Sequence, residues 1–126
     1  MKTFSVQLST CYLWLLLLFA FGCTKDVLLI RIENDSISMF NQVRINPDDN
    51  ETMFGDLAPG ETSAFKPFEK AYRYAQVKLV IEGKEYILQP IDYVGETPLE
   101  NGKYTYIIGV GDLESPYGLT IDLRED

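Results

Sequence analysis

Carboxylates crowd one short segment of the chain, where they could bind a metal ion. Asp48, Asp49, Asn50 and Glu51 follow one another directly after Pro47. Calcium takes about six to eight oxygen ligands at ~2.3–2.6 Å. Four successive residues cannot all turn toward one ion, and the residue order of an EF-hand loop is absent. We therefore expect a solvated turn here, with no metal site and no cofactor.

A pair of carboxylates could also perform acid–base chemistry. A glycosidase places two Asp or Glu side chains on either side of the bond that it cuts. The candidates lie mostly in expected turns and are Glu82, Glu85, Asp92, Glu96 and Glu100. Nothing in their spacing marks two of them as a pair, so we do not expect an enzyme. A small carboxylate-based hydrolase that acts on envelope or extracellular glycans remains the alternative.

Two residue types that usually carry chemistry are scarce. The chain has no histidine, and its two cysteines are Cys11 and Cys23. This composition excludes a Ser-His-Asp triad, a Cys-His pair and every metal site that needs histidine or four cysteines.

Tyrosines are the better candidates for a binding surface, since each combines a large apolar ring with a polar tip. Tyr72 and Tyr74 are two residues apart, the spacing of strand residues on one face. Tyr93 lies in the loop sequence PIDYVGETP, which proline and glycine bound. We expect these three tyrosines to form a surface for a protein or glycan partner. Packing in or beside the core is the alternative for the Tyr72–Tyr74 pair, and also for Tyr104 and Tyr106.

The elements that position these residues are predicted to be strands. Apolar residues alternate with polar ones, with period two, in several short runs. The runs are Val27–Glu33, Gln42–Asn46, Val77–Glu82, Tyr86–Leu88, Tyr104–Val110 and Leu119–Arg124. Turn residues separate them, and Gly83 in the sequence EGKE suits a tight hairpin. The segment FEKAYRYA, Phe68–Ala75, suits either a short helix or a strand.

The spacing of three residues narrows the fold. Leu99, Gly102 and Tyr104 in PLENGKYTY follow the pattern L-x-x-G-x-Y. This pattern resembles the tyrosine corner of immunoglobulin-like and fibronectin-like sandwiches, which implies a tyrosine hydroxyl bonded to backbone just upstream. With the strand spacing, it predicts an all-β, immunoglobulin-like Greek-key antiparallel sandwich of about seven strands over residues 27–126, after an N-terminal signal helix.

The charge of the chain limits its partners. All 19 acidic residues and 10 of the 11 basic ones lie from Cys23 onward, a net charge of about −9 for that part. Phosphates and anionic headgroups both attract Lys and Arg. We therefore expect no nucleic acid partner and no adsorption to anionic lipid by charge.

A run of nine apolar residues, Leu13–Phe21, precedes Cys23. As a helix it would be roughly 14 Å long, about half of the hydrocarbon core of a bilayer. Continuing it to span length would place Lys25 and Asp26 near the middle of the membrane, at a cost of about 2.5–3.5 kcal/mol each. With Lys2 before it, the run predicts a secretory signal peptide.

The sequence AFGC, ending at Cys23, resembles the lipobox of bacterial lipoproteins. The resemblance implies cleavage after Gly22, acyl chains on Cys23, a short tether over residues 23–26, and placement in the outer membrane facing the periplasm or the cell surface. Phe21 departs from the commonest pattern, and an ordinary signal peptide is the alternative. Two or more acyl chains are needed for stable attachment to a bilayer.

The segment Phe68–Tyr106 resembles a group of small bacterial envelope lipoproteins, and the rest of the chain does so in pattern only. The resemblance carries over no catalytic or binding residues. We therefore expect a lipid-anchored envelope lipoprotein that is a non-enzymatic binding, scaffold or accessory module. A purely structural envelope component is a further alternative.

Overall fold

The computed structural model describes residues 27–47, 50–90, 96–115 and 118–126. These residues form eight strands and no helix. The strands are β1 (Leu28–Asn34), β2 (Phe40–Asn46), β3 (Thr52–Leu57), β4 (Lys66–Phe68), β5 (Gln76–Ile81), β6 (Lys84–Leu88), β7 (Gly102–Val110) and β8 (Leu119–Glu125). The expected leader and tether, residues 1–26, lie outside the described ranges.

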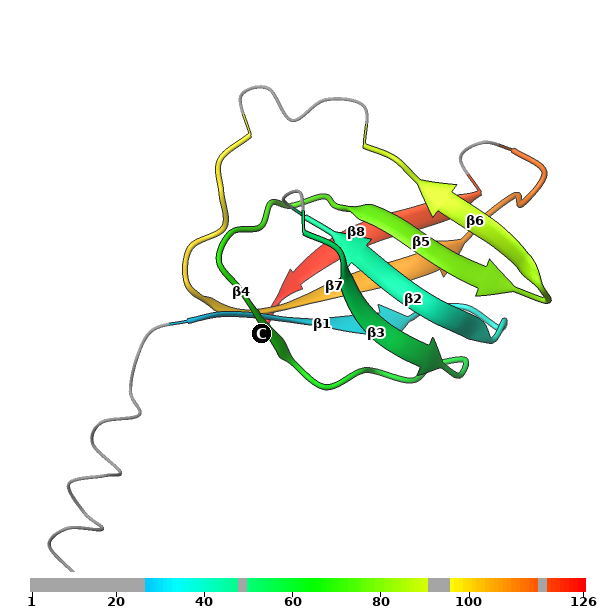
Figure 1. Ribbon diagram of the computed structural model, residues 1–126, viewed down its shortest axis with the longest axis horizontal. Coiled ribbons are helices and arrows are strands. Elements are labelled where there is room, and N and C mark those ends of the chain that lie inside the picture. The colour runs from blue at the N-terminus through cyan, green and yellow to red at the C-terminus, as the bar shows by residue number, and fades with distance from the viewer. Residues whose placement is uncertain (1–26, 48–49, 91–95, 116–117) are drawn as a thin grey trace, which may run out of the picture.

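The strands make two four-stranded sheets that pack as a β-sandwich (Figure 1). One sheet has the order β4-β1-β7-β8, and the other has the order β3-β2-β5-β6. The predicted all-β sandwich is therefore confirmed.

The pairing differs in one respect from the antiparallel sandwich that the sequence predicts. β1 and β7 pair in parallel, from Leu28 opposite Gly102 to Asn34 opposite Ile108, whereas the other strand pairs are antiparallel. Parallel neighbours need a long connection between them, and the chain between these two strands contains all four strands of the second sheet.

The alternation of the sequence produces the core. Side chains of β1 and β5 alternate strictly between buried and partly exposed positions. The buried apolar residues are Leu28, Ile30, Ile32, Phe40, Val43, Ile45, Leu57, Ala71, Ala75, Val77, Leu79, Ile81, Tyr104, Tyr106, Ile108 and Leu119. Burial of a large aliphatic side chain contributes about 1.5–3 kcal/mol, so these rows hold the two sheets together.

A bulge in β2 brings Phe40 into this core. Phe40 and Val43 are both fully buried although their spacing of three would place them on opposite faces of a regular strand. The register of β2 shifts between them, and Gln42 has a φ of 52°. An extra residue at a bulge reverses which face the following side chains occupy.

The predicted hairpin after β5 is confirmed. Ile81 pairs with Lys84, and the two residues between them, Glu82 and Gly83, have φ values of 49° and 79°. Two successive positive φ values are those of the type I′ turn that two-residue hairpins favour. The strands β3 and β4 were not predicted, because neither shows a clear alternation.

The segment after β4 is neither the helix nor the strand that its sequence suggested. Residues 69–75 form a connection without regular structure, in which Ala71 and Ala75 are fully buried. Its small residues pack against the core while the long polar side chains stay outside.

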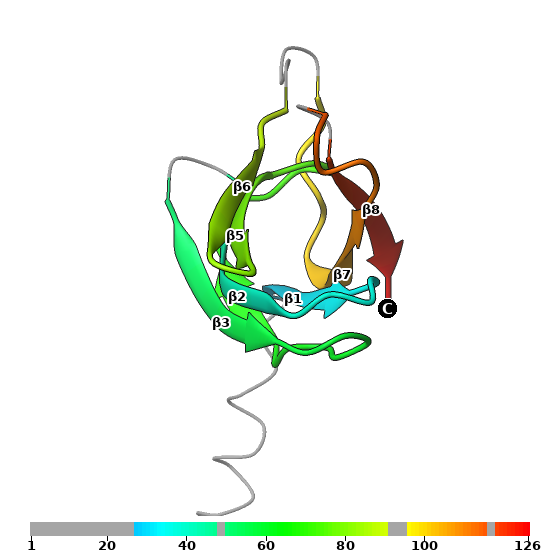
Figure 2. The ribbon, with the colours of Figure 1, turned by 90° about the vertical axis from the view of Figure 1, so that its right-hand side faces the viewer.

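The sandwich has two ends, which we name by one residue of each. At the Val27 end β1 and β7 begin and β8 finishes, and at the Ile37 end β1 and β7 finish and β8 begins. Figure 2 looks at the Ile37 end, with β5 and β6 on one side and β7 and β8 on the other. At this end lie the β1–β2, β3–β4, β5–β6 and β7–β8 connections.

Candidate functional site

Several residues singled out from the sequence lie outside the described ranges. They are Cys23 with its leader, Asp48, Asp49, Asp92 and Tyr93. Within those ranges no helix has the length and apolar character to cross a bilayer.

Tyr72 and Tyr74 do not share a face in the way that strand spacing implies, because their segment is not a strand. Tyr74 is 42% exposed, whereas Tyr72 is partly buried beneath Lys70, whose Nζ lies 5.4 Å from the ring centroid. The carbonyl oxygen of Tyr72 accepts a hydrogen bond from the hydroxyl of Tyr106. The alternation argument that joined the two tyrosines into one surface was therefore wrong.

Leu99, Gly102 and Tyr104 lie close together where β7 begins. The Tyr104 hydroxyl donates to the carbonyl oxygen of Glu100 at 2.9 Å. Gly102 has a φ of 153°, and a Cβ placed there would lie 3.7 Å from the Tyr104 ring. Leu99 packs against the core, and its N–H donates to the carbonyl of Ala71 at 2.8 Å. Burial raises the pKa of Tyr104, and nearby carboxylates add to the shift, so the hydroxyl stays protonated and able to donate.

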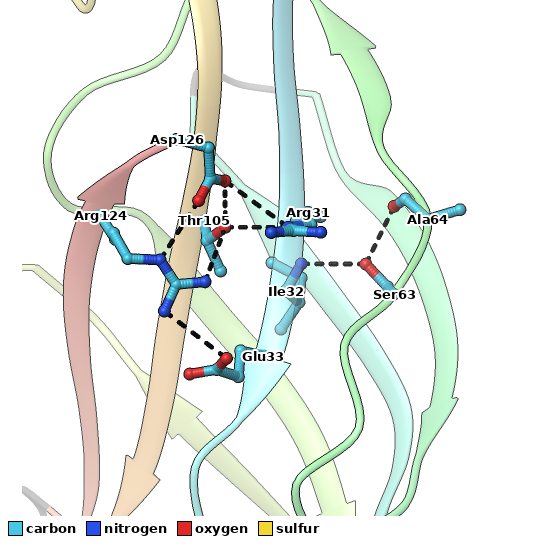
Figure 3. Close-up of polar contacts among 8 residues, drawn as sticks. All are labelled: Arg31, Ile32, Glu33, Ser63, Ala64, Thr105, Arg124 and Asp126. Atoms are coloured by element: carbon cyan, nitrogen blue, oxygen red, sulfur yellow. Dashed lines mark hydrogen bonds and ion pairs between the residues drawn. The ribbon is translucent and has the colours of Figure 1, made fainter.

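A polar network crosses the outer face of the β1-β7-β8 sheet (Figure 3). The fully buried hydroxyl of Thr105 accepts from Arg31 Nε at 3.0 Å and donates to Asp126. Arg124 lies 3.2 Å from Asp126 Oδ1 and 3.6 Å from Glu33 Oε1. The Thr105 hydroxyl, together with the two guanidinium groups, lowers the pKa of Asp126. Each charge of this network has a partner, which is the arrangement of a structural ion-pair network across the sheet.

Among the residues that the structure describes, the carboxylates proposed for a hydrolase do not all lie together. Glu85 binds Arg44 at 2.8 Å, on the outer face of the second sheet. Glu82 lies at the Ile37 end, in the β5–β6 turn, whereas Glu100 lies at the Val27 end, just before β7. Side chains at opposite ends of a sandwich cannot act on one bond.

No metal cluster forms in the ranges that the structure describes. Of the acidic turn after Pro47, Glu51 pairs with Lys78 across 3.5 Å. A hollow of about 190 Å³ lies beside this turn at the Val27 end. Its lining includes Phe68, Glu69 and Lys70, so Glu69 is the one carboxylate among the described residues that line it.

The strongest candidate for a functional surface is the β1–β2 turn, residues 35–39, and it is built on Asn34. The Asn34 side chain is fully buried, and its Nδ2 donates to the carbonyls of Ser38 at 2.8 Å and Leu57 at 3.0 Å. Its Oδ1 accepts from the N–H and the hydroxyl of Ser36, at 3.1 and 2.6 Å. Both ends of one amide are therefore used to fix the turn.

The backbone of the turn is also tied to its neighbours. Asn34 N–H donates to the carbonyl of Glu61, and Asp35 N–H donates to the carbonyl of Ile108. Ser38 N–H donates to the hydroxyl of Ser36 at 3.1 Å. The turn is thus anchored to both the β3–β4 connection and the end of β7.

This fixed turn displays an aliphatic side chain to solvent. Ile37 at its tip is 98% exposed, and Met39 beside it is 42% exposed. They border a shallow hollow of about 460 Å³, lined by Ile37, Ser38, Met39, Asn41, Ile81 and Glu82. Single exposed apolar residues are ordinary on protein surfaces. Ile37 differs from such residues because the buried Asn34 amide fixes the turn that carries it, and a hollow lies beside it.

The connections at the Ile37 end of the sandwich are acidic. The described residues of the four connections at this end contain five exposed acids and no lysine or arginine; the acids are Asp35, Glu61, Glu82, Asp112 and Glu114. None of the five forms an ion pair with another described residue. The nearest cation in the β5–β6 hairpin, Lys84, lies with its Nζ 5.3 Å from the Tyr86 ring centroid.

Sequence reasoning missed this surface. The sequence NDSIS, Asn34–Ser38, places one isoleucine among four residues that favour turns. An aliphatic residue inside such a run is the signal that could have identified an exposed apolar tip.

The fold and this surface define a β-sandwich with a preformed acidic and apolar tip. No protein-family model matches the chain, and no curated protein is significantly similar to it in sequence. Among solved structures, the chain is similar to one described as the NMR structure of the protein from Eubacterium rectale. The TM-score is 0.57 at 11% sequence identity, and the match covers 82% of this chain and 94% of the other. At this identity the similarity establishes the fold alone.

Proposed function

We propose that this protein is a non-enzymatic binding module of the bacterial cell envelope, anchored by acyl chains on Cys23 in the outer membrane, and that it binds a partner through the Ile37 end. The observation that carries the binding role is the Asn34-braced turn, which holds Ile37 in solvent at 98% exposure. A preorganised apolar anchor gives affinity because little conformational entropy is lost when it binds.

The placement of the two ends supports this role. Residue 27 follows the tether, and Ile37 lies at the other end of β1. Seven strand residues span about 23 Å, and the four-residue tether reaches at most about 14 Å. A domain anchored at Cys23 would therefore keep the Val27 end near the bilayer and present Ile37 away from it.

Site-specific photocrosslinking in the organism that produces the chain tests the binding role. A photoreactive amino acid replaces Ile37 in one variant and Ile87 in a control, since Ile87 is 47% exposed on β6, in the middle of the second sheet's edge. We expect one discrete adduct from position 37 and none of the same mass from position 87. Equal labelling at both positions, or none at position 37, would exclude the Ile37 end as the binding surface.

A further inference from the structure

The charges around Ile37 identify the kind of partner. We propose that the Ile37 end binds a protein surface in which an apolar pocket is bordered by lysine and arginine side chains. This inference rests on the proposed binding role and specifies the chemistry of the partner.

Ile37 supplies the apolar part of the contact. Its side chain is almost entirely in solvent, Met39 adds a partly exposed apolar side chain, and the hollow beside them is lined by apolar and polar residues alike. Binding energy at protein interfaces concentrates in a few central side chains that enter pockets of the partner, surrounded by contacts that exclude water. An isolated aliphatic tip of this kind fits a concave apolar surface.

The five unpaired carboxylates supply the rim. They come from four separate connections. Glu61 of the β3–β4 connection is bonded through its carbonyl to Asn34, the last residue of β1, and Asp35 of the β1–β2 turn is bonded to Ile108 in β7. Glu82 lines the hollow with Ile37 itself. Exposed ion pairs add little affinity individually, but a ring of one sign accelerates association with a surface of opposite sign and rejects surfaces of like sign.

Charge and the lack of a neighbouring exposed aromatic residue in the β1–β2 turn argue against other partners for this surface. A second copy of the chain would bring five carboxylates against five, and an anionic lipid surface would also be repelled. Carbohydrate binding typically uses exposed aromatic rings. The aromatic residue closest in sequence to this turn, Phe40, is fully buried in the core.

The test compares two charge-reversal variants, each with the photoreactive amino acid at position 37. The yield of the photoadduct is measured in isolated envelopes. One variant carries Glu82→Lys and Glu114→Lys at the Ile37 end, and the matched control carries Glu69→Lys and Glu100→Lys at the Val27 end. All four side chains are exposed, and both pairs change the net charge equally. We expect the first pair to lower the adduct yield about tenfold and the control pair to leave it unchanged.

The crosslinked partner peptide, sequenced by mass spectrometry, should lie beside lysine or arginine residues, and the yield should fall as NaCl is raised from 0.05 to 0.5 M. A specific adduct that neither charge reversal nor salt affects would overturn the basic-partner inference but leave the binding role intact. An adduct to a second copy of the chain or to lipid would overturn it as well. Absence of a specific adduct at position 37 would remove the binding role and this inference together.

Discussion

Tyr104 donates its hydroxyl to the carbonyl oxygen of Glu100, four residues upstream, at 2.9 Å. The ring also covers Gly102, where a Cβ would lie 3.7 Å from it. The bond fixes the loop that leads into β7, the strand that pairs with both β1 and β8.

Removing this hydroxyl tests its contribution to stability. We expect Tyr104→Phe to lower the free energy of unfolding by about 1 kcal/mol or more, because the Glu100 carbonyl loses its partner. Tyr74→Phe is the control, since Tyr74 is 42% exposed and should change stability little. Chemical denaturation of the domain measures both, and an unchanged midpoint for Tyr104→Phe would show that the bond contributes nothing.

The buried Asn34 amide should be essential to the β1–β2 turn. Asn34→Ala leaves two carbonyls and the Ser36 N–H without their side-chain partner, so we expect a loss of about 2 kcal/mol or more. Hydrogen exchange at Ser36 and Ser38 should accelerate more than exchange in β5. Asn50→Ala, at an exposed position, is the control. Uniform acceleration throughout the domain would mean that Asn34 supports global stability alone and not the turn in particular.

Asp126 should contribute to the acid sensitivity of the fold. Its pKa lies below the ordinary value because the Thr105 hydroxyl donates to it and two arginines lie nearby. A carboxyl group with a lowered folded-state pKa stabilises the fold at pH values above its unfolded-state pKa, near 4, and this stabilisation is lost as the pH falls through the folded-state value. Asp126→Asn should reduce stability at pH 7 and flatten its decline below about pH 4. Glu69→Gln changes an exposed side chain and is the control, and the acid-induced decrease in its free energy of unfolding should match that of the wild type. Urea denaturation at a series of pH values measures all three proteins.

Gly118 is confined by backbone. A Cβ there would lie 2.9 Å from the carbonyl oxygen of Asp112 and 3.0 Å from the Leu113 Cα, neither of which can rotate away. We expect Gly118→Ala to cost about 1–3 kcal/mol. In Gly111→Ala the Cβ would meet only the Gly118 carbonyl, at 3.8 Å, so we expect a cost in unfolding free energy below about 1 kcal/mol. Thermal unfolding of the two variants should therefore show Gly118→Ala to be less stable by about 1 kcal/mol or more. Equal melting temperatures for the two variants would contradict this.

The proposed lipid anchor can be tested by replacing Cys23, whose sulfur atom would be acylated. Cys23→Ala should move the full-length protein from the detergent phase to the aqueous phase in phase partitioning, since attachment depends on the acyl chains. Cys11→Ala, within the expected leader, should leave partitioning as it is. Retention of the Cys23→Ala protein in the detergent phase would place the anchor elsewhere.

Local sequence predicted the strands whose two faces differ in burial. The runs Leu28–Ile32 and Val77–Ile81 alternate in sequence and in burial alike, whereas in β7 the polar Thr105 is buried together with Tyr104 and Tyr106. It did not predict β3, where Gly55 has a φ of 84° and the alternation is broken, or β4, which has three residues. Strands as short or irregular as these are specified by their neighbours and not by their own pattern.

The candidate site was less predictable than the fold. Tyr72 and Tyr74 have the spacing of residues on one face of a strand. They lie instead in an irregular connection, in which Ala71 and Ala75 are buried in the core. Ile37 belongs to no alternating run of apolar residues, so the sequence pattern does not indicate whether it is buried or exposed. Whether an aliphatic residue in a turn is covered or displayed depends on what packs over it, and only tertiary contacts determine that.

The sequence by itself determined the all-β class, the alternating core positions and the turn at Glu82 and Gly83, because side-chain alternation and positive φ are local properties of the chain. Only the tertiary structure decided the parallel pairing of β1 with β7, the bulge at Gln42 and the gathering of acidic turns around Ile37. Strand partners and register depend on how whole faces pack across the sandwich, and residues far apart in the chain carry that information.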